Sequence, residues 1–283
     1  MKKHTYHTVL TIAGSDSSGG AGIQADLKTF AALGCYGMSV ITSLTAQNTV
    51  GIMSVLDMPA GFVAKQIDAV FDDIGVDAVK IGMVKNEEII RIISRKLRSY
   101  RPSCIVIDPV MIAKDGKRLL RQDAIHALTT QLFPLATIVT PNIPEAVFLT
   151  GCVIRNENDV EKAGMRLLSY GPEAVLLKGG HTKNNICQDC LCIAEANGKI
   201  SIKWLGKRRI QTKNTHGTGC TLSSAIAAYL AQGYGILEAV KQSKQYITGA
   251  IKAGAAYRLG KGHGPVHHFY KGVINQNLER ATS

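Results

Sequence analysis

The chain has 283 residues, 46% of them hydrophobic, which is enough to fill the core of one large α/β domain. Its formal net charge is +12, from 33 Lys and Arg against 21 Asp and Glu, and such a charge attracts nucleotides, phosphorylated metabolites or nucleic acid. The basic residues are dispersed except at 207–209, a cluster that no nucleic-acid motif surrounds and that we interpret as a solvated charged face. We therefore expect no nucleic-acid partner.

Nothing in the sequence predicts a secreted or membrane protein. The start, Met1 to His7, leads into a short apolar strand instead of a signal-peptide core, and no apolar run approaches the roughly 20 residues of a membrane span. The seven cysteines are odd in number and mostly scattered, as reduced thiols are. We expect a cytoplasmic protein with no membrane partner.

Strand and helix patterns alternate along most of the chain, which predicts a largely parallel sheet covered by helices on both faces. Buried strands are expected at 8–13, 37–44, 76–81, 104–108, 136–140 and 174–178. Helices are expected between them at 23–33, 61–72, 87–100, 122–132, 144–149 and 158–170, with Asn86 as a helix cap.

The pattern changes after Lys178. Residues 190–195 and 199–205 flank Asn197-Gly198, a strong hairpin signal, so antiparallel strands should be added to the edge of the sheet. Two long helices, 218–232 and 236–259, follow. No repeat, low-complexity tract or linker divides the chain, so we predict a single domain over residues 1–283.

Two segments could suggest a metal. Cys187, Cys190 and Cys192 lie close together after His181, but a zinc site needs a second pair of ligands in matching geometry, so incidental thiols are favoured. The His-rich run from His263 to His268 is interpreted as a loop that docks the carboxy terminus.

Polar side chains follow three of the predicted strands. Asp108 ends one of them, Asn142 and Glu145 follow the next, and Lys178 ends a third. Ligands in α/β proteins bind at the carboxyl ends of strands, and oxygen donors of this kind suit magnesium, which keeps waters and bridges phosphates. Each residue alone could be an ordinary surface residue, but together they predict a magnesium nucleotide site.

A glycine-rich turn, Asn214 to Cys220, leads into the predicted helix 218–232. The free backbone N–H groups at such a helix start, here at Thr215, Gly217, Thr218 and Gly219, form a ready anion-binding site. Cys220 lies in the first turn, where the helix dipole favours a thiolate. The alternative interpretation is a tight turn before a core helix.

This turn resembles the anion hole of ribokinase-type small-molecule kinases, which usually have Asp-Thr-x-Gly-Ala-Gly-Asp. Here Asn214, Thr218 and Cys220 replace the first Asp, the Ala and the last Asp, and a Cys in that position is similar to the branch that phosphorylates hydroxymethylpyrimidine and pyridoxal. The run from Gly14 to Thr29 closely resembles the substrate loop of the hydroxymethylpyrimidine phosphate kinases. It is not a dinucleotide fingerprint, since the spacing is not GxGxxG.

The resemblance implies a ribokinase-like fold, ATP and Mg²⁺ as cofactors, and a homodimer. It also implies two successive transfers, first to the alcohol of the aminopyrimidine and then to its monophosphate, giving a pyrophosphate for thiamine synthesis. By the same resemblance, Asn142 and Glu145 organise magnesium, Asp108 supports that site through water, and Lys178 neutralises charge on the transferred phosphate.

The ring pocket follows from the resemblance too: Gly14, Asp26, Met83 and Val110 should line it, although Met83 could equally be a core filler. Gln47 favours an aminopyrimidine over pyridoxal, because a side-chain amide can pair with a ring nitrogen and an exocyclic amine together. We expect Cys220 to accept or orient the proton of the substrate hydroxyl.

Three other functions stay open at this point. The nearest is a pyridoxine or pyridoxal kinase of the same branch. A non-catalytic sensor that binds the pyrimidine without consuming ATP belongs to a different class, and a basic nucleic-acid binder is the third.

Overall fold

A computed structural model of the protein describes residues 5–111, 122–179 and 186–272. Within these ranges, nine strands form one sheet in the order β3-β2-β1-β4-β5-β6-β7-β8-β9. The strands are β1 (Thr8–Asp16), β2 (Tyr36–Gln47), β3 (Ile52–Asp57), β4 (Ala78–Ile81), β5 (Cys104–Ile107), β6 (Ile138–Val139), β7 (Ala174–Leu177), β8 (Ile186–Ala194) and β9 (Ile200–Arg208). β2, β1 and β4 to β7 are parallel, and β3, β8 and β9 pair antiparallel at the edges. The predicted α/β architecture is confirmed.

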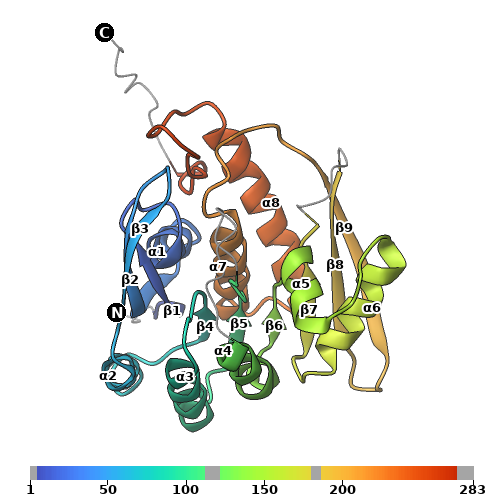
Figure 1. The fold of residues 1–283 in the computed structure, drawn as a ribbon, viewed down its shortest axis with the longest axis horizontal. Coiled ribbons are helices and arrows are strands. Elements are labelled where there is room, and N and C mark those ends of the chain that lie inside the picture. Colours follow the sequence, from blue (N-terminus) through green and yellow to red (C-terminus); the bar gives the residue numbers. More distant parts are fainter. Residues whose placement is uncertain (1–4, 112–121, 180–185, 273–283) are drawn as a thin grey trace.

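Helices cover both faces of the sheet (Figure 1). α1 (Gly22–Ala32), α7 (Thr218–Ala231) and α8 (Ile236–Gly254) contribute to the apolar core on one face. On the other face, the core is formed with α2 (Ala60–Phe71), α3 (Glu87–Tyr100), α4 (Gln122–Ala127), α5 (Ile143–Thr150) and α6 (Glu157–Leu168). All residues of β4 and β7 are buried, because parallel strands between two helix layers have no solvent face.

Local signals explain most of the helix boundaries. The Asn86 side chain accepts a hydrogen bond from the Ile89 N–H at 2.8 Å, which confirms it as the cap of α3. Gly233 follows α7 with a φ of 86°, a left-handed conformation that glycine adopts without strain. None of the helices in the described ranges has the length and apolar character that crossing a membrane requires.

Some elements differ from prediction. The edge strand β3 was not predicted, and the predicted helix 122–132 is α4 followed by a π-helical turn, η1 (Leu128–Leu132). The last helix ends at Gly254 instead of 259, because other segments bind its final carbonyls. Asn214 Nδ2 donates to the Gly254 oxygen at 2.7 Å and to the Tyr257 oxygen at 2.6 Å, so Asn214 fastens the glycine-rich turn to the end of α8.

The His-rich segment, His263 to His268, lies against α7 and α8. The His267 N–H donates to the Ala250 carbonyl of α8 at 3.0 Å. His268 is buried, and its Nε2 lies 3.0 Å from Thr221 Oγ1 in α7. Burial lowers the pKa of His268 to about 4, so this ring is neutral and packs as part of the core at physiological pH. His263 and His267 do not join it in a metal cluster, since the described residues contain no group of three His, Cys, Asp or Glu suited to a metal ion.

Candidate active site

The carboxyl ends of the parallel strands and the amino end of α7 surround a cavity of about 880 Å³. The parallel strands all end at this edge, where the connecting loops diverge and leave room for a ligand. Of the residues predicted to form the site, the following line the cavity: Gly14, Gln47, Met83, Asp108, Val110, Asn142, Glu145, Lys178, Thr215, Gly217, Thr218, Gly219 and Cys220.

The start of α7 is built as predicted for an anion-binding turn. Gly217 is its N-cap residue with a φ of 78°, and no side chain from the described part of the chain caps it. A Cβ at Gly217 would overlap the carbonyl oxygen of Gly20, so the two glycine-rich loops pack directly on each other. The Thr218 N–H makes only a long contact of 3.4 Å with the Thr215 carbonyl. The Thr215 N–H donates to the Lys213 carbonyl at 3.0 Å, so the prediction of a free N–H at Thr215 is wrong.

The charged residues lie beside this helix start. A Cβ added at Gly219 would lie 3.5 Å from both Asp108 Oδ2 and Lys178 Nζ, so the charged groups lie at contact distance from the helix start. Lys178 Nζ donates to Asp108 Oδ1 at 2.7 Å, and Thr140 Oγ1 donates to the same oxygen at 3.1 Å. Burial alone would raise the pKa of Asp108, but Lys178 and Lys80 outweigh it and hold the pKa below its usual range. The pair is thus ionised.

Asn142 and Glu145 form a capping box at the start of α5. The Asn142 side chain accepts from the Glu145 N–H at 2.9 Å, and Glu145 Oε2 accepts from the Asn142 N–H at 2.8 Å. Burial raises the pKa of Glu145 to about 7, with the Lys178 charge opposing that rise and the Asp108 charge adding to it. Two buried carboxyls thus share one lysine, an arrangement that a further cation would stabilise.

Cys220 is half-buried at the cavity wall, as predicted, but its thiol is not activated. Burial raises the pKa of Cys220 to about 11, and the charges of Asp26 and Asp108 add to the rise, whereas Lys80 and the Gly22 backbone oppose it. The prediction of a thiolate is therefore wrong, because desolvation and two carboxylates outweigh Lys80 and the Gly22 backbone. The resting residue is a neutral thiol.

Asp26 is not on the cavity wall, although the resemblance placed it in the ring pocket. Its carboxylate is fully buried behind the wall, where Lys80 Nζ donates at 2.9 and 3.0 Å. Thr11 Oγ1 and Ser224 Oγ also donate to it, each at 2.6 Å. A buried charge needs this degree of pairing, so the contacts of Asp26 are structural ones that hold α1, β4 and α7 together.

The ring end of the cavity is closely packed. A Cβ at Gly14 would lie 2.5 Å from Met83 Cε and 2.8 Å from Ser43 Oγ, so a larger residue there would displace the ends of these two side chains. Met83 itself lines the cavity. The Gln47 backbone is held by Ser17, whose Oγ accepts from the Gln47 N–H at 2.8 Å and donates to the Gln47 carbonyl at 2.7 Å.

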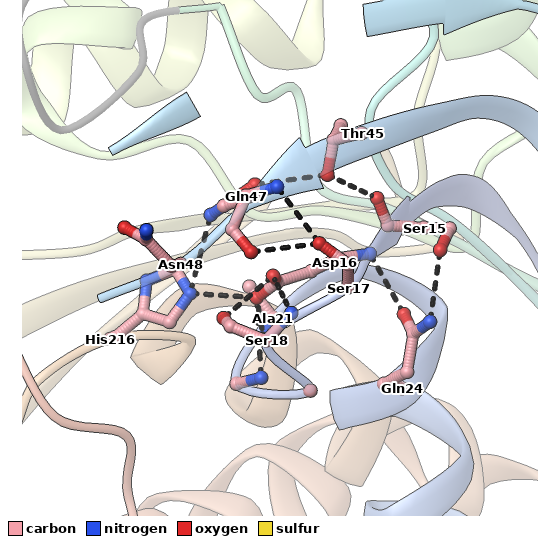
Figure 2. A network of polar contacts seen from close by, with 12 residues as sticks. Ser15, Asp16, Ser17, Ser18, Ala21, Gln24, Thr45, Gln47, Asn48 and His216 are labelled. Carbon is pink, nitrogen blue, oxygen red and sulfur yellow. Dashed lines mark hydrogen bonds and ion pairs between the residues drawn. The ribbon is translucent and has the colours of Figure 1, made fainter. Parts of the chain in front are cut away.

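Several cavity residues were missed at the level of sequence. His216 and Asp16 form a 2.8 Å contact beside Gln47, which Figure 2 shows, and Lys80 reaches the cavity from within β4. Lys80 could have been noticed as a lysine inside an apolar strand. The cluster at 207–209 also lines the cavity, and Lys207 and Arg208 are exposed, which agrees with its interpretation as a solvated charged face.

The cysteine cluster forms no metal site in the described residues. Cys190 and Cys192 are buried on β8 with their sulfur atoms 3.8 Å apart, and both pack in the core. His181 lies outside the described residues. The favoured interpretation as incidental thiols agrees with the packing of Cys190 and Cys192.

A mainly parallel sheet with an anion-binding helix start, a lysine and paired carboxylates at its carboxyl edge defines a ribokinase-like kinase of small molecules. Comparison with known proteins gives the family. The chain belongs to the phosphomethylpyrimidine kinase family, whose model matches residues 16–267.

Relatives and solved structures agree with this assignment. The chain is 50% identical over 263 residues to a hydroxymethylpyrimidine/phosphomethylpyrimidine kinase of Rhizobium meliloti, covering 93% of this chain and 97% of that protein. It is 52% identical over 261 residues to the thiamine biosynthesis bifunctional protein ThiED of Geobacter sulfurreducens, covering 92% of this chain but only 52% of that protein.

Two crystal structures show the same fold. The phosphomethylpyrimidine kinase of Clostridium difficile has a TM-score of 0.74 at 51% identity, with 86% of this chain and 99% of that chain covered. The Bacillus subtilis pyridoxal kinase, in an ADP complex, has a TM-score of 0.84 at 36% identity, with 93% and 98% covered.

Proposed function

We propose that the protein transfers phosphate from ATP to 4-amino-5-hydroxymethyl-2-methylpyrimidine and then to the resulting monophosphate, giving the pyrophosphate for thiamine synthesis. The observation that carries the proposal is that Gln47 and Cys220 line one cavity together with the start of α7. Gln47 offers paired hydrogen-bond groups to an aminopyrimidine, and the helix start offers N–H groups to phosphate. The family assignment and the names of its members support the same reaction.

The nucleotide fits the remainder of the cavity. Residues 207–209 and Lys244 line that part with positive charge, while Ile247 and Ile251 of α8 line it with apolar surface. Lys244 is held by an ion pair with Asp189. Positive charge suits a polyphosphate and apolar surface suits a base, so we propose that ATP lies between α8 and the loop after β9.

Asp108, Asn142 and Glu145 fit magnesium, partly through water. Their oxygen donors are the kind that Mg²⁺ prefers, and the raised pKa of Glu145, about 7, indicates a buried carboxyl that needs additional positive charge. When bound, magnesium would neutralise phosphate charge. The cluster lies next to Lys178, so the protein's own cation and the metal would act on the same phosphates.

Phosphoryl transfer passes through a loose transition state that asks little of a base and much of charge placement. The substrate hydroxyl oxygen forms a bond to the γ-phosphorus as the bond to the β-bridging oxygen breaks, and ADP leaves. Since Cys220 is a neutral thiol with a pKa of about 11, we propose that its sulfur orients the hydroxyl by accepting a hydrogen bond. The hydroxyl proton is lost to water after attack, while Lys178 and the helix N–H groups stabilise the transferred phosphoryl.

The second transfer uses a different nucleophile. The monophosphate is already an anion, so it needs no group that handles a proton. Replacing Cys220 by Ala should therefore slow the first transfer more than the second, by about tenfold or more. The matched control is Cys152→Ala, which removes a half-buried thiol outside the cavity.

The test is a product assay with ATP, magnesium and hydroxymethylpyrimidine, in which the mono- and diphosphate are separated and quantified. We expect both products from the wild type, and a lower rate with pyridoxal. Binding of the pyrimidine without ATP consumption would instead indicate a sensor, and pyridoxal as the faster substrate would indicate a pyridoxal kinase. Equal losses of both steps in Cys220→Ala would contradict the role of the thiol.

We also propose that the chain forms a homodimer through the β3 edge of the sheet and that it acts in the cytoplasm. β3 is the terminal strand of the sheet, and its Met53 and Leu56 are 71% and 63% exposed. An exposed edge strand with large apolar side chains is a surface that proteins usually cover.

A further inference from the structure

Figure 2 shows a network of polar contacts that includes Gln47, the residue proposed above to recognise the substrate ring. His216 Nε2 lies 2.8 Å from Asp16 Oδ2 and 3.4 Å from Gln47 Nε2. Asp16 ends β1, Gln47 ends β2 and His216 belongs to the turn before α7, so the contacts join three separate segments. The side chains of Asp16 and His216 are only 3% and 14% exposed.

Asp16 is an ionised acceptor. Its carboxylate accepts from the Ser18 N–H at 2.9 Å, from Ser18 Oγ at 2.7 Å and from the Ala21 N–H at 2.8 Å. Burial would raise the pKa of Asp16, but the hydrogen bonds from His216 and Ser18 hold it at about 2. A carboxylate has no proton to give, so the 2.8 Å contact requires that His216 Nε2 carry the hydrogen and donate it.

Because His216 Nε2 is a donor, only an acceptor can form a hydrogen bond with it. If Nε2 is a donor, the amide nitrogen of Gln47 at 3.4 Å, itself a donor, cannot bond to it. The oxygen of the same amide, Gln47 Oε1, faces another acceptor. Thr45 Oγ1 gives its proton to the Ser15 carbonyl at 2.7 Å, so it meets Gln47 Oε1, 3.3 Å away, with a lone pair.

Rotating the amide by half a turn resolves both conflicts. The two orientations fill the same space, so the neighbouring donors and acceptors decide between them. With Oε1 towards His216, the single Nε2 hydrogen that Asp16 binds at 2.8 Å is shared with Oε1 at 3.4 Å, and the NH₂ group meets the lone pair of Thr45 Oγ1. The remaining amide lone pair and N–H then face the cavity that Gln47 lines.

We propose that Asp16 and His216 lock the Gln47 amide in this orientation and thereby determine which ring edge the site accepts. The locked amide accepts on the His216 side and donates on the Thr45 side. In the ring orientation that directs the alcohol towards Cys220, it therefore matches an amino group beside an unprotonated ring nitrogen, and rejects a carbonyl beside a ring N–H; an oxo ring turned over would carry its alcohol away from Cys220. Asp16 and His216 are positioning residues in this proposal, which rests on the proposed function.

The lock also sets the direction of the alcohol. In the proposed substrate, the hydroxymethyl carbon is attached next to the amino-bearing carbon, on the side away from the ring nitrogen that pairs with Gln47. An amino group on the His216 side therefore directs the hydroxymethyl towards the turn that carries His216. Cys220 lies four residues later in that same turn.

The test compares two ring analogues by calorimetry: the 4-amino substrate and its 4-oxo analogue, in which the donor and acceptor are exchanged. Wild type should bind the amino ring about 100-fold more tightly, because an oxo ring leaves two amide groups unpaired. In His216→Phe no ring N–H faces Gln47, and in Asp16→Asn the side chain can also donate, so His216 Nε2 need no longer carry the hydrogen and the Gln47 amide is free to rotate. The preference should fall tenfold or more, mainly through tighter binding of the oxo ring.

Two further variants separate positioning from folding. His216→Gln keeps an N–H donor and should restore most of the preference. Lys28→Met removes a contact of Lys28 Nζ with the Gly19 carbonyl, 2.7 Å, in the same loop but away from Gln47, and should leave the preference unchanged. If His216→Phe does not fold, Asp16→Asn, which keeps the shape of the side chain, carries the test.

The outcomes distinguish the two proposals. An equal loss of affinity for both rings in Asp16→Asn and His216→Phe would overturn the lock while leaving the proposed function intact. Tight binding of the amino ring with no phosphorylated product would reject the proposed function, and the affinity ratio would still decide on the lock. If wild type bound neither ring, both proposals would fall.

Discussion

Glu145 offers a stability test of the candidate metal site that needs no ligand. Its carboxyl is 4% exposed, and burial raises its pKa from an ordinary 4.5 to about 7. A raised pKa means that the folded state favours the protonated form. The stabilisation is therefore complete below the unfolded pKa near 4.5, and it is lost as the pH rises through about 7.

Glu145→Gln removes this dependence while keeping an oxygen that can accept from the Asn142 N–H. A rise in pKa of about 2.5 corresponds to about 3 kcal/mol of unfolding free energy, at 1.36 kcal/mol for each pKa unit. Most of this difference in the free energy of unfolding develops between pH 5 and pH 8.5. The stability of the variant relative to the wild type should therefore rise by about 2.5 kcal/mol over that interval. The gain is expected although the residue is proposed to serve the function, because the charge is costly without its cation.

The assay is urea unfolding in metal-free buffer at several pH values, followed by the fluorescence of Trp204, the one tryptophan of the chain. Glu173→Gln, at an exposed position, is the matched control and should show no comparable trend. Magnesium should stabilise the wild type more at pH 8.5 than at pH 6, since a cation favours the ionised carboxyl. A difference between Glu145→Gln and wild type that stays constant with pH would refute the reasoning.

Two other predictions concern packing and assembly. Gly217 and Gly198 both have a φ of 78°, but a Cβ at Gly217 would overlap the Gly20 carbonyl, whereas nothing lies within 4 Å of one at Gly198. Gly198→Ala should cost about 1 to 2 kcal/mol from backbone strain alone. Gly217→Ala should cost at least about 2 kcal/mol more and abolish turnover, measured by urea unfolding and the product assay. Equal costs would contradict the packing of the two loops. A Met53→Lys, Leu56→Lys double variant should be monomeric by light scattering, while Val153→Lys, at a position 65% exposed, stays dimeric. Unchanged mass in both would place the interface elsewhere.

The sequence predicted the parallel part of the sheet well, because strands buried on both faces are continuous apolar runs. β4 and β7, for example, have no exposed residue. β3 was missed because its partner contacts lie on one side only. Its residues are half-buried or exposed, so Ile52–Asp57 lacks the buried run that marked the other strands.

Of the predicted site residues, all but Asp26 line the cavity, but electrostatics and hydrogen-bond partners could not be predicted. The pKa of Cys220 depends on Asp26 and Asp108, which are distant in sequence and come close only in the fold. The motif predicts Asp26 as a pocket residue, but Lys80, 54 residues away, neutralises it in the core. His216 belongs to the glycine-rich turn, but its partner Asp16 is 200 residues away in the sequence. The motif therefore does not predict their contact.

The central claim is that one cavity holds the aminopyrimidine against Gln47 with its alcohol at Cys220 and the phosphates at the start of α7. The most direct measurement is a crystal structure with hydroxymethylpyrimidine, magnesium and a non-hydrolysable ATP analogue. We predict the amino group and ring nitrogen at the Gln47 amide, the hydroxyl oxygen beside Cys220 Sγ, and the γ-phosphate on the N–H groups of residues 217–220. A ring bound away from Gln47, or a γ-phosphate remote from that helix start, would contradict the account.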